Sequence, residues 1–580
     1  MKKQLFYCLL SCTSLCSITG HALEVSKTYV PKKKSMYHKE WIDFNKNGRK
    51  DIYEDPKAPL NERIEDLLSQ MTVEEKTCQM VTLYGYQRVL KDSLPTPDWK
   101  NQLWKDGIGA IDEHLNAFRG WGVPPMQNEL VWPASNHAWA LNEVQRFFVE
   151  ETRLGIPADF TNEGIRGIEN YIATNFPTQL ALGHTWNREL IRQVGYITGR
   201  EARLLGYTNV YAPILDVGRD QRWGRYEEVY GESPYLVAEL GIAMGKGLQT
   251  DMQVAYSNNK GAREGFARVD PQMSWREVEN IHAYPFTRVI QEAGILGVMS
   301  SYNDYDGFPI QSSYYWLTQR LRGTMGFRGY VVSDSDAVEY LYSKHKTAKD
   351  MKEAVRQSVE AGLNVRCTFR SPESYVLPLR ELIQEGGLSM ETIDNRVRDI
   401  LRVKFLTGLF DTPYQTDLTL ADKEVNSEAH QQVALQASRE GLVLLKNANN
   451  LLPLDKSQIK RIAVCGPNAD EASFALTHYG PVAVEVTTVL EGIKQQVKEG
   501  TKVTYTKGCD LVDANRPESE IISYPLTAEE KTEIQKAVDN VKESDVAVVV
   551  LGGGIRTCGE NKSRTSLDLP GHQQQLLEAI

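Results

Sequence analysis

Short apolar runs alternate with helical patterns over most of the first 410 residues. Three runs, Val210–Ile214, Gly297–Ser301 and Gly329–Ser333, have the length of buried strands, and each is followed by polar residues. Between such runs lie stretches such as Arg188–Leu205, whose apolar residues recur at the spacing of an amphipathic helix. Repeated strand–helix units predict an α/β protein with a TIM-type (β/α)8 barrel over residues 57–410.

Aspartates stand close behind several of the predicted strands. Catalytic groups of TIM-type barrels lie at the C-terminal ends of the strands, which makes these side chains candidates for chemistry. An aspartate at that place also commonly caps the helix that follows, so the pattern alone leaves both roles open. The aspartates concerned are Asp216, Asp304, Asp334 and Asp336.

A second region follows a polar, turn-rich segment at 411–428 that is typical of a linker. It begins with a helical pattern over Glu428–Leu445. The apolar runs that start at Ile462 and Val546 predict buried parallel strands ending in glycine turns. Gly552–Gly554 lacks the rest of a nucleotide-binding motif, so we expect no organic cofactor.

The first 22 residues have the pattern of a signal peptide. Lys2 and Lys3 precede an apolar stretch, and Gly20-His21-Ala22 offers small residues for cleavage. We therefore expect an exported protein, periplasmic or extracellular. Lipoprotein anchoring at Cys12 is the less favoured alternative, because Leu-Leu-Ser before it is a poor lipobox. No later run is long enough to span a membrane.

Residues 23–56 form a predicted N-terminal arm that contains an EF-hand-like calcium loop. Residues 43–54 match the motif D-x-[DN]-x-[DN]-G-x5-E at every specified position. Oxygen atoms at these spacings converge on a hard cation, and Gly48 permits the sharp turn. The alternative is a solvated Asn/Gly turn without metal. The expected ligands of a structural Ca²⁺ belong to Asp43, Asn45, Asn47, Arg49 (through its carbonyl), Asp51 and Glu54.

Charge and cysteine content exclude several classes of protein. The formal net charge is −10, and a pI near 5.7 argues against nucleic acid as a partner. Three of the 8 cysteines fall inside the leader, and the remaining odd number contains no CxxC pair. A disulfide framework or a zinc site is therefore not expected.

Several separated motifs resemble glycoside hydrolase family 3. Asn-Glu-Gly-Ile-Arg-Gly at 162–167 resembles the family's first sugar-binding turn, and residues 216–234 resemble its long signature. Residues 298–303 and 326–334 are similar to the Ser-Tyr-Asn strand and the nucleophile strand. Residues 440–454 resemble the start of the family's second domain. The resemblance implies an α/β sandwich domain over 429–580, incomplete at its C-terminal end.

The mechanism that the resemblance implies is retaining glycoside hydrolysis, which uses two carboxyl groups about 5–5.5 Å apart. Asp334 is then the nucleophile, and Tyr302 lies near it. Glu560, in a loop of the second domain, is the matching acid/base. Closing onto the barrel is expected to desolvate Glu560 and raise its pKa, as a general acid requires. The alternative is a solvated loop glutamate.

Two further residues are implied as sugar ligands. Glu163 is expected to accept hydrogen bonds from sugar hydroxyls, and Arg225 to donate them. The alternative for Arg225 is an ion pair with Glu227 or Glu228. Trp223 either stacks on a sugar face or packs beneath its loop.

The sequence departs from the family pattern at one internal place. Family members carry a Lys-His pair that binds the sugar, and here about eight to ten residues are missing between Ala255 and Tyr256. Losing such contacts costs about 1.5–3 kcal/mol each when one partner is charged. The departure brings catalytic activity into question.

The substrate implied is a plant-polysaccharide oligosaccharide. Residues 173–177 and 333–338 resemble β-xylosidase-like members, and Ser335 stands where many β-glucosidases have Trp. We expect an exo-acting β-glycosidase that releases terminal xylose or glucose, with xylosides slightly favoured. The alternative is a catalytically impaired, sugar-binding relative.

Overall fold

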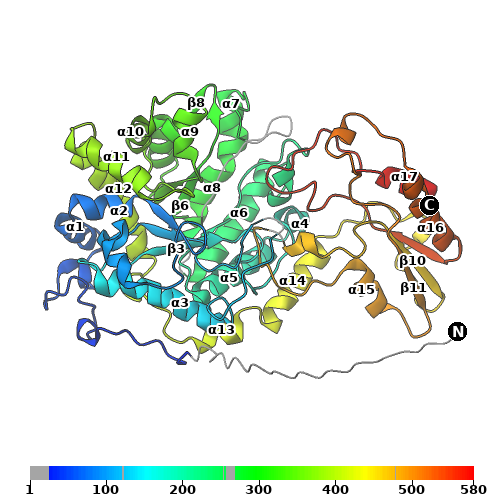
Figure 1. Ribbon diagram of the computed structural model, residues 1–580, viewed down its shortest axis with the longest axis horizontal. Coiled ribbons are helices and arrows are strands. Elements are labelled where there is room, and N and C mark those ends of the chain that lie inside the picture. Colours follow the sequence, from blue (N-terminus) through cyan, green and yellow to red (C-terminus); the bar gives the residue numbers. More distant parts are fainter. Residues whose placement is uncertain (1–24, 121–122, 252–253, 256–267, 477) are drawn as a thin grey trace, which may run out of the picture.

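The computed structural model describes residues 25–580 except 121–122, 252–253, 256–267 and 477. The predicted leader and the segment that follows Ala255 therefore lie outside the described residues. Figure 1 shows a large domain, coloured blue to green, beside a smaller one, coloured yellow to red. Among the described residues, no helix is long and apolar enough to cross a membrane.

Eight strand positions form the ring of the large domain. Five parallel strands pair in sequence order: β1 (Thr82–Tyr84), β2 (Ala110–Asp112), β3 (Asp159–Glu163), β4 (Asn209–Tyr211) and β5 (Val254–Ala255). β6 (Gly297–Ser300) pairs in parallel with β9 (Tyr330–Ser333). Parallel bridges from Val332 to Val365 and from Arg366 to Val81 then lead back to β1. This is the predicted barrel.

The helices of the large domain surround these strands (Figure 1). They are α1 (Leu60–Gln70), α2 (Val73–Gln79), α3 (Ala134–Arg146), α4 (Gln179–His184), α5 (Arg188–Leu205), α6 (Pro234–Leu248), α7 (Trp275–Glu277), α8 (Ala283–Ala293), α9 (Ala337–Ser343), α10 (Met351–Ala361), α11 (Glu373–Gln384) and α12 (Met390–Leu406). A short hairpin of β7 (Asp304–Tyr305) and β8 (Phe308–Pro309) follows β6.

Local sequence explains both the bounds and the packing of α5. The Asn187 side chain caps its first turn, and Gly206, at φ 100°, ends it in a left-handed conformation. Gly195 and Gly247 let α5 and α6 approach closely. A Cβ at Gly247 would lie 2.2 Å from the Arg192 carbonyl oxygen, so no larger residue fits there.

The structure differs from the predicted linker at 411–428. Thr419–Glu424 form helix α13, which packs on α3 and α5. Helix α14 (Glu428–Glu440) also lies against the barrel helices α4 and α5, and it ends at Gly441 instead of continuing to Leu445. The apolar side chains of Leu442–Leu445 are 56–91% exposed. The chain therefore leaves the barrel only after α14.

The second domain contains a three-stranded parallel sheet. Its strand order is β11 (Lys502–Thr506), β10 (Arg461–Cys465) and β12 (Val546–Val549). The predicted strands at Ile462 and Val546 are thus confirmed. The helices of this domain are α15 (Val489–Gln496), α16 (Ala528–Lys542) and α17 (Gln573–Ala579).

Two loops of the second domain dock on the barrel. In the first, the Gly559 amide donates to the Gly224 carbonyl at 2.6 Å, and the Arg564 amide donates to the Arg222 carbonyl at 2.8 Å. In the second, the Val482 amide donates to the Asn170 carbonyl at 3.0 Å. Backbone contacts of this kind place the loops at fixed positions over the strand ends.

The predicted calcium loop packs against the barrel. Phe44 and Tyr53 are buried beside Phe410. The Asp43 carboxylate accepts hydrogen bonds from the Asn47 and Gly48 amides, and Gly48 has φ 77°. Glu54 folds back and accepts from the Phe44 amide at 2.7 Å.

The donor set of this loop consists of hard oxygens that suit Ca²⁺, although both Glu54 oxygens also hold backbone amides. Calcium binding stays a prediction.

Adding Ca²⁺ to chelator-treated protein is expected to raise the melting temperature by several degrees, because binding to the native state alone stabilises it. Mg²⁺ should have a smaller effect, since it demands a tighter octahedral shell. Differential scanning calorimetry measures both responses. An Asp43→Asn variant, which lacks one charged ligand, should not respond. An unchanged melting temperature for the wild-type protein would contradict calcium binding.

Candidate active site

A polar pocket of about 250 Å³ lies between the strand ends of the barrel and the two docked loops. All five predicted site residues outside the calcium loop line it, namely Glu163, Arg225, Tyr302, Asp334 and Glu560. They come from different barrel strands and loops and from the second domain. The structure thus brings together residues up to 397 positions apart, from 163 to 560.

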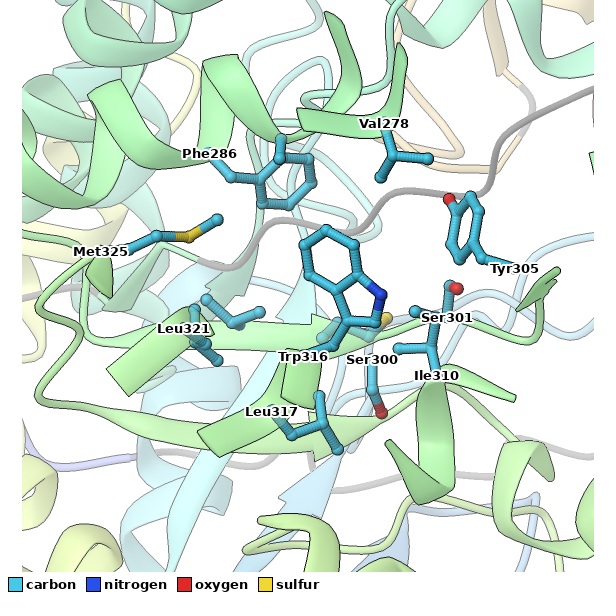
Figure 2. A pocket seen from close by; sticks show the side chains of 13 residues that line it. Val278, Phe286, Ser300, Ser301, Tyr305, Ile310, Trp316, Leu317, Leu321 and Met325 are labelled. Carbon is cyan, nitrogen blue, oxygen red and sulfur yellow. The ribbon is translucent and has the colours of Figure 1, made fainter. Parts of the chain in front are cut away.

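A second cavity, of about 100 Å³, lies beside β6 (Figure 2). Phe286, Trp316, Leu321 and Met325 dominate its wall, and its few polar groups are hydroxyls and an indole nitrogen. None of its described lining residues carries a carboxyl group. Acid–base chemistry is therefore assigned to the polar pocket.

Asp334 follows β9 directly and is 8% exposed. Its amide donates to the Ser300 carbonyl at 3.0 Å, and the Ser335 amide donates to its Oδ1 at 2.8 Å. The Tyr302 hydroxyl also forms a hydrogen bond with the carboxyl group. Burial raises the pKa of Asp334, the Tyr302 bond opposes this, and Glu560 raises it further. One bond thus fixes the Asp334 backbone at the strand end, and the Ser335 amide and the Tyr302 hydroxyl hold its carboxyl.

The other candidate aspartates lie outside the pocket. Asp336 precedes α9 at φ 65° and accepts a hydrogen bond from the Thr368 hydroxyl. It is the helix-start residue that its position predicts. Neither Asp216 nor Asp304 lines the pocket.

Glu560 lies in the loop that follows β12, and three groups hold its carboxylate. Arg268 Nη2 donates to Oε1 at 2.7 Å, and Arg225 Nη1 donates to the same oxygen at 3.3 Å. The Tyr479 hydroxyl donates to Oε2 at 3.0 Å. Glu560 is therefore a bound member of the site and not a solvated loop residue.

The predicted rise in the pKa of Glu560 is wrong for this arrangement. Burial does raise the pKa of this carboxyl, but Arg225 and Arg268 outweigh burial and lower it to about 2. The sequence allowed us to predict that a closing loop would desolvate Glu560. It did not allow us to predict that two guanidinium groups would contact its carboxylate.

The structure confirms the predicted ion pair of Arg225, and its role as a sugar ligand stays a prediction. Its guanidinium forms two hydrogen bonds with Glu228, at 2.7 and 2.6 Å, which is the predicted ion pair. The remaining nitrogen faces Glu560 and the pocket, and the Tyr479 ring lies 5.1 Å away. Trp223 packs with Ile165 and other apolar residues beneath the loop.

Glu163 ends β3 and lines the pocket. No described residue donates a hydrogen bond to its carboxyl group, which leaves both oxygens to the cavity. Burial raises the pKa of Glu163 well above its ordinary value, and nearby Glu113, Glu169 and Asp112 add to this. An unengaged carboxyl in a buried pocket suits a ligand that brings its own hydroxyl groups.

Comparison with known proteins identifies the chain. The model of the glycosyl hydrolase family 3 N-terminal domain matches residues 127–403, and that of the family's C-terminal domain matches 442–580. The chain belongs to glycosyl hydrolase family 3. The resemblance in the separated motifs is thus confirmed, and a C-terminal domain of the family is present.

Curated relatives of this family 3 chain carry the names of two enzymes. It is 33% identical to a "Beta-xylosidase" of Formosa agariphila over 74% of this chain and 61% of the relative. It is 31% identical to the "Periplasmic beta-glucosidase" of Salmonella typhimurium over 89% of this chain and 66% of that protein. The chain thus spans slightly less than two thirds of the length of these relatives.

Solved structures of family 3 proteins share the fold. A β-glucosidase from Erythrobacter marinus superposes with a TM-score of 0.81 at 28% identity, over 92% of this chain and 71% of that one. A β-glucosidase from Listeria innocua in complex with isofagomine gives 0.74 at 29% identity, over 89% and 67%. A TIM-type barrel followed by an α/β sandwich is therefore confirmed.

Several pocket residues of this family 3 chain escaped prediction. Arg88 pairs with Glu113 at 2.5 Å, and His478 stacks on Phe118 with ring centroids 4.0 Å apart. Tyr479 precedes Gly480 in the second domain, and this local pattern gives no reason to place the tyrosine beside the barrel.

A possible set of metal ligands also lies in this pocket. Ligand atoms of Glu113, Glu163 and His478 lie within 4.8 Å of one another, and two carboxylates with an imidazole suit a divalent cation. Arg88 already neutralises Glu113, and Glu169 bonds His478. The cluster faces the space that a ligand of the pocket would fill.

Replacing Glu163 by Gln is expected to raise the melting temperature by a few degrees at pH 8 and by less at pH 5. The native state resists ionisation of this carboxyl, whereas the unfolded chain ionises it above a pKa of about 4.5. Stability is therefore lost as the pH rises, and glutamine removes that loss. Thermal melting at both pH values measures the difference.

The exposed Glu578→Gln variant serves as the control and should show no such pH dependence. An equal gain at pH 5 and pH 8 for Glu163→Gln would contradict a buried, reluctantly ionised carboxyl.

Proposed function

We propose that this protein is a retaining, exo-acting β-glycosidase that releases terminal β-linked xylose or glucose from plant-polysaccharide oligosaccharides. Xylosides are slightly favoured over glucosides. The observation that carries the proposal is that Asp334 and Glu560, from two domains, face one pocket and influence each other's pKa. Two such carboxyl groups are what double displacement at a sugar carbon needs.

In the first half of the reaction, an Asp334 oxygen attacks the anomeric carbon of the terminal sugar. The bond from that carbon to the leaving oxygen breaks, and Glu560 gives its proton to that oxygen. A covalent glycosyl–Asp334 ester results. Tyr302 donates to the Asp334 carboxyl and so favours its ionised, nucleophilic form.

In the second half, Glu560 is ionised and acts as the base. It takes a proton from water, the water oxygen attacks the anomeric carbon, and the ester bond to Asp334 breaks. Glu560 is then protonated and Asp334 ionised, as at the start. Two inversions at one carbon retain the β configuration.

The proposed sugar ligands are Glu163 and Arg225. Glu163 presents free oxygens to the pocket, and Arg225 points one nitrogen into it while Glu228 holds the rest of the guanidinium. Hydrogen bonds to such charged groups are stronger than those to neutral ones. Small polar sugars offer the matching hydroxyl groups.

Support for a xylose preference comes from the surroundings of Asp334. Ser335 lines the pocket, and its hydroxyl hydrogen-bonds with the Tyr84 hydroxyl at 2.8 Å. The Phe369 ring stacks on Tyr84 with centroids 4.2 Å apart. These side chains occupy space beside the nucleophile, which favours a sugar without an exocyclic hydroxymethyl group.

The leader pattern supports export, to the periplasm or the medium, with lipoprotein anchoring less favoured. The alternative function, a catalytically impaired sugar-binding protein, follows from the missing Lys-His segment after Ala255. That segment adjoins residues 256–267, which lie outside the described part of the chain. The relatives named above are enzymes, and nothing among them favours the alternative.

Hydrolysis of nitrophenyl β-xyloside and β-glucoside tests the proposal. Wild-type protein should release nitrophenol from both, faster from the xyloside. An Asp334→Ala variant should lose about 10³-fold or more in kcat, since it removes the group that forms the intermediate. Release of nitrophenol measured against time gives both values.

Asp336→Asn is the matched control, because this aspartate lies two positions away, precedes helix α9 outside the pocket, and has a positive φ that asparagine also adopts. It should retain activity. No turnover by wild-type protein that still binds xylose would support the sugar-binding alternative. Full turnover by Asp334→Ala would contradict the nucleophile assignment.

A further inference from the structure

Arg268 connects the loop that carries Glu560 to the barrel. Its Nη2 donates to Glu560 Oε1 at 2.7 Å, and its Nη1 donates to the Tyr340 hydroxyl at 3.3 Å. The guanidinium carbon also lies 4.2 Å from the centre of the Tyr302 ring. One side chain therefore contacts both the candidate acid/base and the tyrosine that hydrogen-bonds with Asp334.

Arg268 lies closer to the Glu560 carboxylate, at 2.7 Å, than Arg225 does, at 3.3 Å. Arg225 already has a buried partner in Glu228, with which it forms two short hydrogen bonds. Among the described residues, Glu560 is the only carboxylate within ion-pair distance of Arg268. Arg268 is also partly buried, with 29% of its side chain exposed, so water screens the pair incompletely.

Several other groups face the Glu560 carboxyl. Apart from Arg268, they offer it no positive charge that is not shared with another carboxylate. Tyr479 donates a neutral hydrogen bond, whereas the Arg225 charge is shared with Glu228. Asp334 is the remaining acidic neighbour across the pocket. The titratable and charged groups concerned are Arg225, Arg268, Glu228, Asp334, His478, Tyr479 and Tyr302.

We propose that Arg268 is a positioning residue, which docks the Glu560 loop on the barrel and decides which of the two carboxyl groups holds their shared proton. The proposal rests on the proposed function. With Arg268 on Glu560, as in the structure, Glu560 is the carboxyl that ionises first, and Asp334 keeps its proton to higher pH. Turnover needs the reverse distribution, with one proton moved from Asp334 to Glu560.

In this proposal, binding of the sugar moves the proton from Asp334 to Glu560. Arg268 lines the pocket, so hydroxyl groups of a bound sugar can accept the hydrogen bonds that it now gives to Glu560. Once the guanidinium turns to the sugar, Glu560 loses its nearest partner and can accept the proton. Asp334 becomes ionised at the same step, and no proton is gained or lost overall.

The pH dependence of kcat/KM tests this role. In an Arg268→Gln variant, the acid limb of the profile should move to higher pH by roughly one unit, because loss of the neighbouring cation raises the pKa at which Glu560 ionises in the free enzyme. Arg268→Lys keeps the charge and should leave the limb near its wild-type position, with a lower kcat. A fall in kcat at every pH with an unmoved limb in Arg268→Gln would overturn the proposal.

Arg398→Gln is the matched control. Arg398 is also 29% exposed and pairs with one carboxylate, Glu65, at the outer helices α12 and α1. Its replacement removes an equivalent ion pair that lies away from the pocket. The profile should be unchanged, and an equal shift in this variant would overturn a specific role for Arg268.

A thermal double-mutant cycle separates this inference from the proposed function. Arg268→Gln should lower the melting temperature of the wild-type protein at pH 7 but not that of a Glu560→Gln variant, because their interaction is then already lost. Additive effects would overturn the docking role whether or not the protein is active. Coupling in a protein that hydrolyses neither glycoside would support docking while refuting the glycosidase proposal.

Discussion

The contact between Glu560 and the arginines of the barrel is the interaction on which the site depends. It joins a loop glutamate of the second domain to the barrel that carries Asp334. Arg225 and Arg268 reach the same carboxylate oxygen from different segments. Backbone hydrogen bonds from Gly559 and Arg564 then fix the loop in place.

A pocket so rich in buried acids carries an electrostatic cost. Asp112, Glu113, Glu163 and Glu169 all lie near one another, and burial raises the pKa of each. Arg88 offsets part of this by pairing with Glu113. The remaining strain is expected at a binding site, because groups that await a ligand cannot also be satisfied within the protein.

The residues that sequence could predict are those whose role follows from a local pattern. Asp334 stands at the end of a strand that is recognisable from its apolar run, and Glu163 lies in a short motif that resembles the family's sugar-binding turn. Arg268 and Tyr479 act through neighbours that are 292 and 81 positions away, a distance that no local pattern encodes. The same limit explains the error over the pKa of Glu560. It also explains helix α13, whose turn-rich sequence becomes helical where the barrel helices provide a surface for Ala421.

The contact between Gly224 and Gly559 has a consequence for the position of Glu560. A Cβ at Gly224 would lie 2.4 Å from the Gly559 carbonyl oxygen, so the two backbones meet with no room for a methyl group. Gly559 directly precedes Glu560, and a side chain at position 224 would therefore push the neighbouring carboxylate away from Arg225 and Arg268. A glycine that does not line the pocket thus sets how closely the second domain approaches the barrel.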